Sequence, residues 1–80
     1  MKLFDKCIEN IDNWFDAFNK FGATGNKIYE ELMQTYAIKV DKYVLEIEEA
    51  GLSYMFYNEI LNNKGYTRNN INFIRGVTKC

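Results

Sequence analysis

The sequence contains no histidine and no proline, and only two cysteines among its 80 residues. Without histidine, the chain lacks the side chain that serves as general base in Ser–His–Asp triads and that most often ligates metals. Cys7 and Cys80 lie at opposite ends of the chain, so they cannot form a thiolate zinc cluster. The sequence therefore predicts a non-catalytic binding protein without a metal or another cofactor, rather than an enzyme.

Export signals and long apolar runs are also missing. Asp5 and Glu9 interrupt the apolar residues near the N-terminus, which is unlike a secretory signal. No run approaches the ~18 apolar residues that a membrane-spanning helix needs. Two cysteines without a disulfide framework are typical of a reducing compartment, with a Cys7–Cys80 bridge as the alternative. We therefore expect a cytoplasmic protein that does not bind membranes.

The chain is rich in apolar and aromatic residues. They make up 48% and 16% of the sequence, the composition of a folded domain rather than of a disordered tail. Its length predicts a single domain over residues 1–80. A domain this short buries only ~60–65% of the surface that its unfolded chain exposes, so its stability margin is small.

Apolar residues recur at steps of three and four from Leu3 to Phe21, which predicts a helix of about five turns with one apolar stripe. Gly22 and Gly25 end this helix, because glycine adopts the left-handed cap conformation without strain. A second helix is expected from about residue 25 or 26 to Tyr36. Its apolar stripe consists of Ile28, Tyr29, Leu32, Met33 and Tyr36.

Residues 37–57 fit two structures. Val40, Val44 and Ile47 would share one face of a third helix, but the same stretch also alternates apolar and polar side chains as two short strands would. Its Lys, Leu, Glu and Ala content favours the helix, whereas its β-branched and aromatic residues favour strands. In the helical version, Gly51 ends the third helix and Ser53 caps a fourth.

The end of the chain predicts one more helix. Gly65 ends the preceding helix, and Thr67 is a natural N-cap for a short helix with Ile71, Ile74 and Val77 on its apolar side. The whole pattern predicts a mainly α fold, a compact bundle of four to five short helices. The alternative is an α+β fold with a small antiparallel meander at 35–57.

Five positions near the C-terminus follow the spacing of a known motif. Ile60 lies in one helix, Gly65 and Tyr66 form the turn, and Ile71 and Ile74 lie in the next helix. This segment resembles the helix-turn-helix motif of small prokaryotic and phage repressors, in which the start of the second helix enters the major groove of DNA. The resemblance implies a nucleic-acid-binding regulator.

Two residues depart from that motif, and the charge pattern bears on the same hypothesis. Leu61 stands where the motif has a small residue, and Lys64 stands where it has an apolar one. Residues 1–60 carry a net charge of −5, whereas residues 61–80 carry +4. Such asymmetry indicates a site for a polyanion at the basic end.

The side chains at the start of the last helix have the chemistry to contact duplex DNA or RNA. Arg bridges guanine O6 and N7, and Asn pairs with adenine, so Arg68, Asn69 and Asn72 are expected to contact bases. Basic side chains neutralise phosphates, and a helix N-terminus with its capping hydroxyl also contacts them. The predicted contacts are Lys64, Thr67, Arg68, Asn69, Asn70, Asn72, Arg75 and Lys79.

The alternative hypothesis is an inhibitor that blocks a host protein. Ten Asn and no Pro are typical of AT-rich genomes such as those of low-GC bacteria and their phages, which encode small anti-defence proteins, anti-CRISPR proteins among them. Here an acidic, aromatic surface would meet a host protein with a basic surface. The predicted interface consists of Glu46, Glu48, Glu49, Tyr54 and Tyr57.

A homodimer is a third interpretation, and its seam would contain Trp14 and Phe15. A homodimer is also compatible with the first hypothesis, because repressors of this type usually bind two half-sites.

Overall fold

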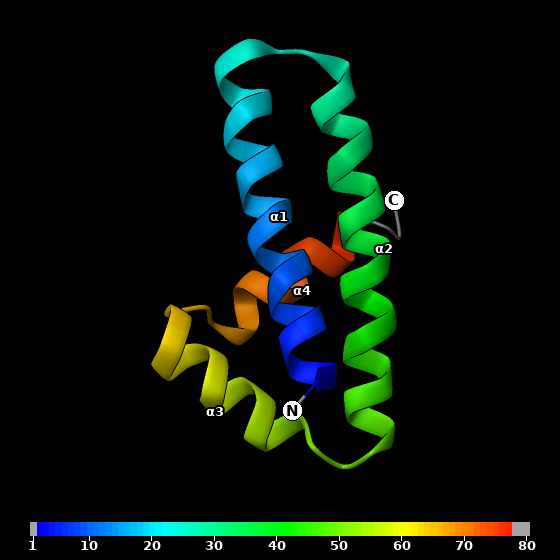
Figure 1. The fold of residues 1–80 in the computed structure, drawn as a ribbon, viewed down its shortest axis with the longest axis vertical. Helices are drawn as coiled ribbons and strands as arrows, with labels where there is room; N and C mark the ends of the chain where they lie inside the picture. Colours follow the sequence, from blue (N-terminus) through cyan, green and yellow to red (C-terminus); the bar gives the residue numbers. More distant parts are fainter. Residues whose placement is uncertain (1, 78–80) are drawn as a thin grey trace.

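The computed structural model describes residues 2–77 and contains four helices in that range (Figure 1). They are α1 (Lys2–Thr24), α2 (Lys27–Glu49), α3 (Ser53–Lys64) and α4 (Arg68–Val77). The prediction of a mainly α bundle of four to five helices is confirmed.

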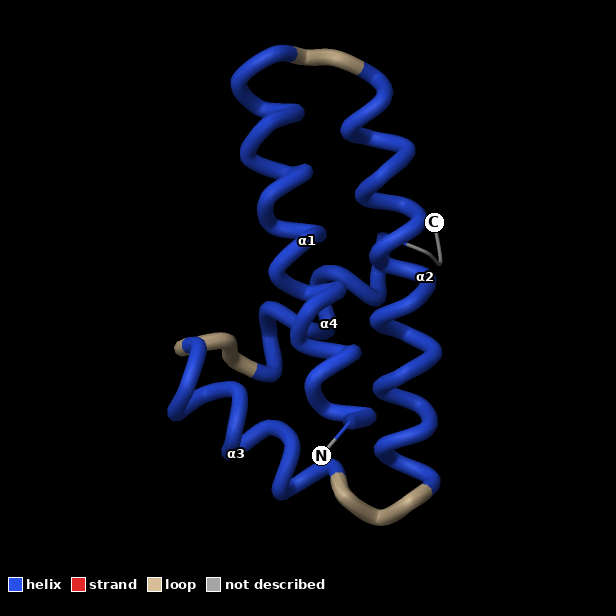
Figure 2. The backbone as a smooth tube through the Cα atoms, viewed as in Figure 1, coloured by secondary structure: helices blue, strands red, loops and turns tan. Residues whose placement is uncertain are grey.

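The strand alternative is wrong. Residues 35–57 contain the second half of α2 and the start of α3, and no strand occurs among residues 2–77 (Figure 2). The expected break after Tyr36 is also absent, because α2 runs on for 23 residues. Neither glycine nor proline interrupts this stretch. Ala37, Val40, Val44 and Ile47 form one buried stripe along it. Burial of that stripe outweighs the β-propensity of the individual residues.

Local capping fixes the ends of α2. The side chain of Asn26 accepts a hydrogen bond from the Ile28 N–H at 3.1 Å, which satisfies one of the free amides of the first turn. At the other end, Gly51 has a φ of 72°. This left-handed conformation lets the chain leave the helix and enter α3.

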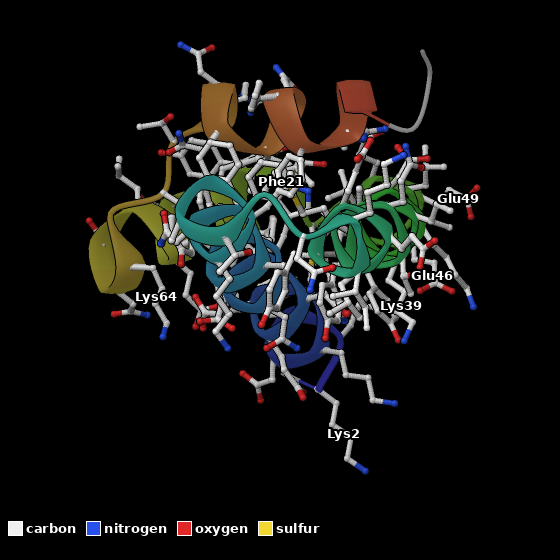
Figure 3. The ribbon with its side chains drawn as sticks, turned by 90° about the horizontal axis from the view of Figure 1, so that it is seen from above. Lys2, Phe21, Lys39, Glu46, Glu49 and Lys64 are labelled. Atoms are coloured by element: carbon white, nitrogen blue, oxygen red, sulfur yellow. The ribbon has the colours of Figure 1, made fainter. Side chains whose placement is uncertain are left out.

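The two long helices form an antiparallel hairpin, and the two short helices cover only one part of it. α4 runs across one face of the hairpin, and α3 diverges from it to the side (Figures 1 and 3). All four helices contribute to one hydrophobic core. The buried core residues are Phe4, Cys7, Ile11, Trp14, Ala17, Ala37, Val40, Val44, Ile47, Phe56, Ile60, Ile71 and Ile74.

Trp14 organises the centre of this core. Its ring stacks on Phe18 at a centroid distance of 5.2 Å and meets Phe15 and Phe73 edge to face. The Trp14 side chain is completely buried within a single chain. The expectation that Trp14 contributes to a dimer seam is therefore wrong, because it has no surface left for a second copy.

The far half of the hairpin has no buried residue. Between Ala17 and Ala37 no residue is buried, although this stretch includes Phe18, Phe21 and Ile28. Figure 1 shows why, since the hairpin extends well beyond α3 and α4 at this end. None of the helices within residues 2–77 is both long enough and apolar enough to cross a membrane.

Candidate binding surface on α3 and α4

The turn between α3 and α4 has the local structure that the sequence predicts. Gly65 has a φ of 72° and its N–H bonds to the Leu61 carbonyl, which ends α3. The Thr67 hydroxyl accepts a hydrogen bond from the Asn70 N–H at 3.2 Å, and the Asn70 side-chain oxygen accepts one from the Thr67 N–H at 2.8 Å. This reciprocal pair is a capping box at the start of α4. Asn70 therefore uses its side-chain oxygen within the turn.

α4 buries one side and exposes the other. Ile71 and Ile74 are buried, while Arg68, Asn69 and Asn72 are exposed. The three residues that the sequence predicts as base contacts therefore share the solvent side of one helix. The main neighbour of α4 is α2 rather than α3. In a helix-turn-helix the two helices of the motif cross closely instead.

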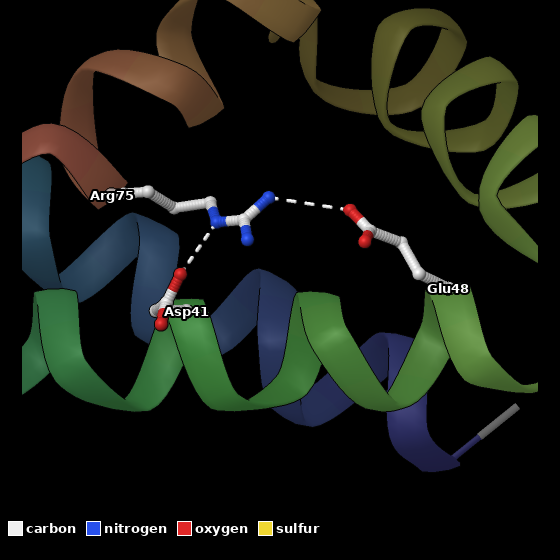
Figure 4. Close-up of polar contacts among 3 residues, drawn as sticks. All are labelled: Asp41, Glu48 and Arg75. Carbon is white, nitrogen blue, oxygen red and sulfur yellow. Dashed lines mark hydrogen bonds and ion pairs between the residues drawn. The ribbon is translucent and has the colours of Figure 1, made fainter.

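Arg75 points back toward α2. Its Nε donates a hydrogen bond to Asp41 at 2.6 Å, and its Nη1 donates one to Glu48 at 3.3 Å (Figure 4). Burial lowers the pKa of the guanidinium, but the hydrogen bond and charge of Asp41 outweigh burial and raise the pKa above its ordinary value. Only 15% of the Arg75 side chain is exposed. Arg75 therefore fastens α4 to α2 and is not part of the exposed surface.

Lys64 pairs with a carboxylate of its own chain as well. Its ammonium lies 3.2 Å from Asp12 on α1, and the Tyr66 hydroxyl donates a hydrogen bond to the same carboxylate. These contacts fasten the end of α3 and the following turn to α1. Lys79, the remaining predicted phosphate contact, lies outside the described residues.

Arg68 differs from these two cations. Within residues 2–77, no carboxylate pairs with it and no hydrogen bond holds its guanidinium. Its guanidinium carbon lies over the ring of Tyr57, 4.1 Å from the ring centroid. Burial raises the pKa of Tyr57, and the charges of Arg68 and Arg75 partly offset that rise.

A hollow of about 280 Å³ opens between α3 and the α3–α4 turn, beside Arg68. Its lining residues are Tyr54, Tyr57, Asn58, Leu61, Tyr66, Thr67 and Arg68. Tyr54 is 85% exposed and Leu61 is 51% exposed. We call this cavity, lined by these seven residues, the α3 hollow. Its walls are mostly aromatic or apolar, and among the described lining residues Arg68 alone carries a full charge at neutral pH.

The sequence indicates some of these residues but not others. Tyr54 and Tyr57 belong to the predicted protein interface, and Thr67 and Arg68 to the predicted nucleic-acid contacts. Leu61 belongs to neither predicted site. Its departure from the helix-turn-helix pattern is the available signal, because the motif has a small residue at this position and the structure leaves Leu61 half exposed.

The acidic part of the predicted protein interface lies on α2. Glu46 and Glu49 point outward from α2, on the opposite side of the molecule from Lys64 (Figure 3). Glu48 pairs with Arg75. The three glutamates line no part of the α3 hollow.

Neither the buried cysteine nor the carboxylates among residues 2–77 form a nucleophile or metal site. Burial raises the pKa of Cys7 to about 12, so this thiol is not a nucleophile at neutral pH. Among the residues that the structure describes, no three Cys, Asp or Glu side chains are grouped to hold a metal ion. Comparison of the chain with protein-family models, with curated proteins and with solved structures gives no match. The α3 hollow and its surroundings are therefore the candidate binding surface.

Proposed function

We propose that this chain is a non-catalytic binding protein that docks on another protein through the outer face of α3 and the α3–α4 turn. The exposure of Tyr54, 85% on the first turn of α3, carries the proposal. Met55 and Leu61 on the same helix are 57% and 51% exposed. Tyrosine, methionine and arginine are enriched in protein interfaces, and Tyr and Arg dominate their binding energy.

The electrostatics favour a protein partner over a nucleic acid. Binding to nucleic acid depends mainly on cations that neutralise phosphates. Lys64 and Arg75 already have carboxylate partners within the chain. Arg68 alone among the described cations of α3 and α4 has none. A protein that binds duplex nucleic acid usually presents several cations to the phosphates, whereas the described part of this surface presents one unpaired cation.

Nucleic-acid binding is the second candidate function, and one observation favours it. Arg68, Asn69 and Asn72 share the exposed side of α4, as they would in a helix that contacts base edges. A duplex binder of this kind would lose affinity steeply with salt. A protein that docks through aromatic side chains would keep most of its affinity.

Affinity capture with matched variants tests the proposal. The tagged chain is used as bait in a lysate of a low-GC bacterium, with and without nuclease treatment, and the captured protein is then purified and titrated against each variant. Tyr54→Ala should weaken binding at least about tenfold, as expected for an exposed aromatic anchor. Ile28→Ala is the control, because Ile28 is also apolar and 54% exposed but lies at the far end of the hairpin. Equal affinities for both variants, or binding that disappears after nuclease treatment, would contradict the proposal.

A further inference from the structure

We infer that the α3 hollow binds a carboxylate that a partner protein presents next to an apolar side chain. This inference rests on the proposed function and adds the chemistry that the docking surface recognises. It assigns the charged contact to Arg68 and the apolar contacts to the neighbouring walls, chiefly Tyr54 and Leu61.

The position of Arg68 leaves its hydrogen-bonding groups available. A contact with the face of an aromatic ring uses the charge of the guanidinium but none of its N–H groups. Arg68 makes such a contact with Tyr57 and has no hydrogen-bond acceptor within residues 2–77. The planar fork of N–H donors matches a carboxylate in two parallel hydrogen bonds. Because Tyr57 already restrains the side chain, less conformational entropy is lost when a ligand binds.

The walls of the hollow determine what accompanies the carboxylate. Tyr54, Tyr57 and Leu61 offer aromatic and aliphatic surface, and no acidic residue among residues 2–77 lines the hollow. At about 280 Å³ it is slightly smaller than the ~300–1,000 Å³ of pockets that hold drug-sized ligands, so it suits one or two side chains. An acidic residue beside an aromatic or aliphatic one has both the size and the charge that the hollow requires.

The rest of the molecule supports a carboxylate as the missing partner. Lys64 and Arg75, the other described cations of α3 and α4, each pair with a carboxylate from α1 or α2. Arg68 lies in the same part of the fold, and its own chain supplies no such group within residues 2–77. A partner protein with an acidic, apolar segment would supply it. A nucleic acid would bring a row of phosphates, for which the hollow has a single cation.

Small ligands test this chemistry on the intact chain. We would titrate the ¹⁵N-labelled protein with 3-phenylpropanoate and, separately, with its neutral analogue 3-phenylpropanamide, and follow the backbone amides by NMR. The acid should shift the amides of Leu61, Thr67 and Arg68, with an affinity roughly tenfold above that of the amide because it forms a charge-assisted pair. Arg68→Gln should remove this difference. Arg68→Lys should retain only part of it, because lysine lacks the planar fork.

Controls separate this inference from its alternatives. Lys27→Gln removes an exposed cation at the far end of the hairpin and should change nothing, and thermal unfolding should show that each variant folds. Equal affinity for acid and amide would overturn the inference, as would an unchanged preference in Arg68→Gln. Saturable binding of an eight-nucleotide poly(dT) at these amides, competing with the acid, would overturn it in favour of a nucleic-acid ligand.

The purified partner distinguishes failure of this inference from failure of the proposed function. If Tyr54→Ala loses the partner while Arg68→Gln retains it fully, the carboxylate contact is refuted and the docking surface stands. If both variants bind the partner normally, the proposed function itself fails. Loss of affinity in both variants, with partial recovery in Arg68→Lys, is the result that supports both.

Discussion

Asp12 holds two residues from the other end of the chain. Its carboxylate accepts a hydrogen bond from the Tyr66 hydroxyl and pairs with the Lys64 ammonium. Burial raises the pKa of Tyr66, and together with the hydrogen bond and negative charge of Asp12 it brings that pKa to about 12. This one carboxylate therefore connects α1 to the end of α3 and to the turn that lines the α3 hollow.

We expect Tyr66→Phe to lower the free energy of unfolding by about 1 kcal/mol at pH 8, because it removes this hydrogen bond. The folded state raises the Tyr66 pKa above its ordinary value of 10.0. The stability gained from the protonated phenol is therefore complete below about pH 10 and is lost as the pH rises toward about 12. Urea denaturation of both proteins between pH 8 and 12 should show their difference shrinking. Tyr54→Phe is the control, and a pH-independent difference for Tyr66→Phe would contradict this account.

The roles that could be predicted from the sequence are those that depend on residues close to one another along the chain. Gly65 and Thr67 were predicted correctly as helix end and helix cap, because their conformations depend on residues within a few positions. The partners of Lys64 and Arg75 lie 52 and 34 residues away along the chain. Only the packing of the helices brings those carboxylates close, and no local pattern encodes it. The same holds for Arg68 over Tyr57, which depends on the angle between two helices.

At the scale of the elements, Arg75 connects α4 to the hairpin. The ion pair with Asp41 is largely buried, with 15% and 23% of the two side chains exposed. α4 has only ten residues, too few for a stable isolated helix in water, so its packing on the hairpin must stabilise it. The second contact, to Glu48, lies on the next turns of α2 and fixes the direction of α4 across the hairpin.

We expect Arg75→Gln to lower the free energy of unfolding by about 1.5–3 kcal/mol, the range for hydrogen bonds to charged groups in partly buried sites. A double-mutant cycle with Asp41→Asn should give a coupling energy above about 1 kcal/mol, measured by urea denaturation. Lys20→Gln breaks the exposed pair with Asp16, whose side chains are 54% and 63% exposed, and should cost less than about 0.5 kcal/mol. A coupling energy near zero between Arg75 and Asp41 would show that packing alone holds α4.

The continuity of α2 leads to a second prediction for the elements. Lys39 lies in the middle of the helix and points outward from it (Figure 3). Lys39→Gly should therefore be less stable than Lys39→Ala by about 1 kcal/mol, the usual difference for an exposed position inside a helix. Urea denaturation of the two variants measures this difference. If it is only a few tenths of a kcal/mol, the helix breaks near Tyr36, as the sequence alone led us to expect.

The helices were easier to predict than their boundaries. α1 follows from a single stripe of apolar residues, the end of α3 from Gly65 and the start of α4 from Thr67. The prediction that Ser53 caps α3 is wrong, because Ser53 is the first residue of the helix and Leu52 precedes it without a side-chain cap.

The sequence pattern divides α2 near Tyr36 because residues 37–57 fit two short strands as well as a helix, whereas the structure has one continuous helix. The buried apolar side chains of α2 lie where the short helices cover the hairpin, and none of its side chains is fully buried beyond that region. The spacing of apolar residues identifies the apolar face of a helix, but it does not show whether another element covers that face.

At the scale of the whole molecule, stability is unevenly distributed. The core lies where α3 and α4 cover the hairpin, and residues 18–36 contribute no buried side chain to it. Segments with few buried apolar contacts open locally at a lower free energy than the core does. We therefore expect the two halves of each long helix to differ in local stability.

Hydrogen exchange should reveal this difference directly. We expect amides of residues 28–35 in α2 to exchange at least about tenfold faster than those of residues 40–47 in the same helix, because the first group has no buried side chain and its opening disrupts less of the core. NMR-detected exchange of the intact chain at constant pH measures both groups in one sample. Uniform protection along α2 would contradict the expectation and show that the hairpin unfolds as one unit.

The exposed end of the hairpin also makes a practical attachment point. The turn at residues 25–26 joins two helices at the end of the molecule farthest from α3 (Figure 1). Exposed turns tolerate insertions well, since little buried structure depends on them. A fluorophore or short epitope placed there would leave the α3 hollow unobstructed, so immobilised or labelled protein could report on its partner without a tag beside the surface under study.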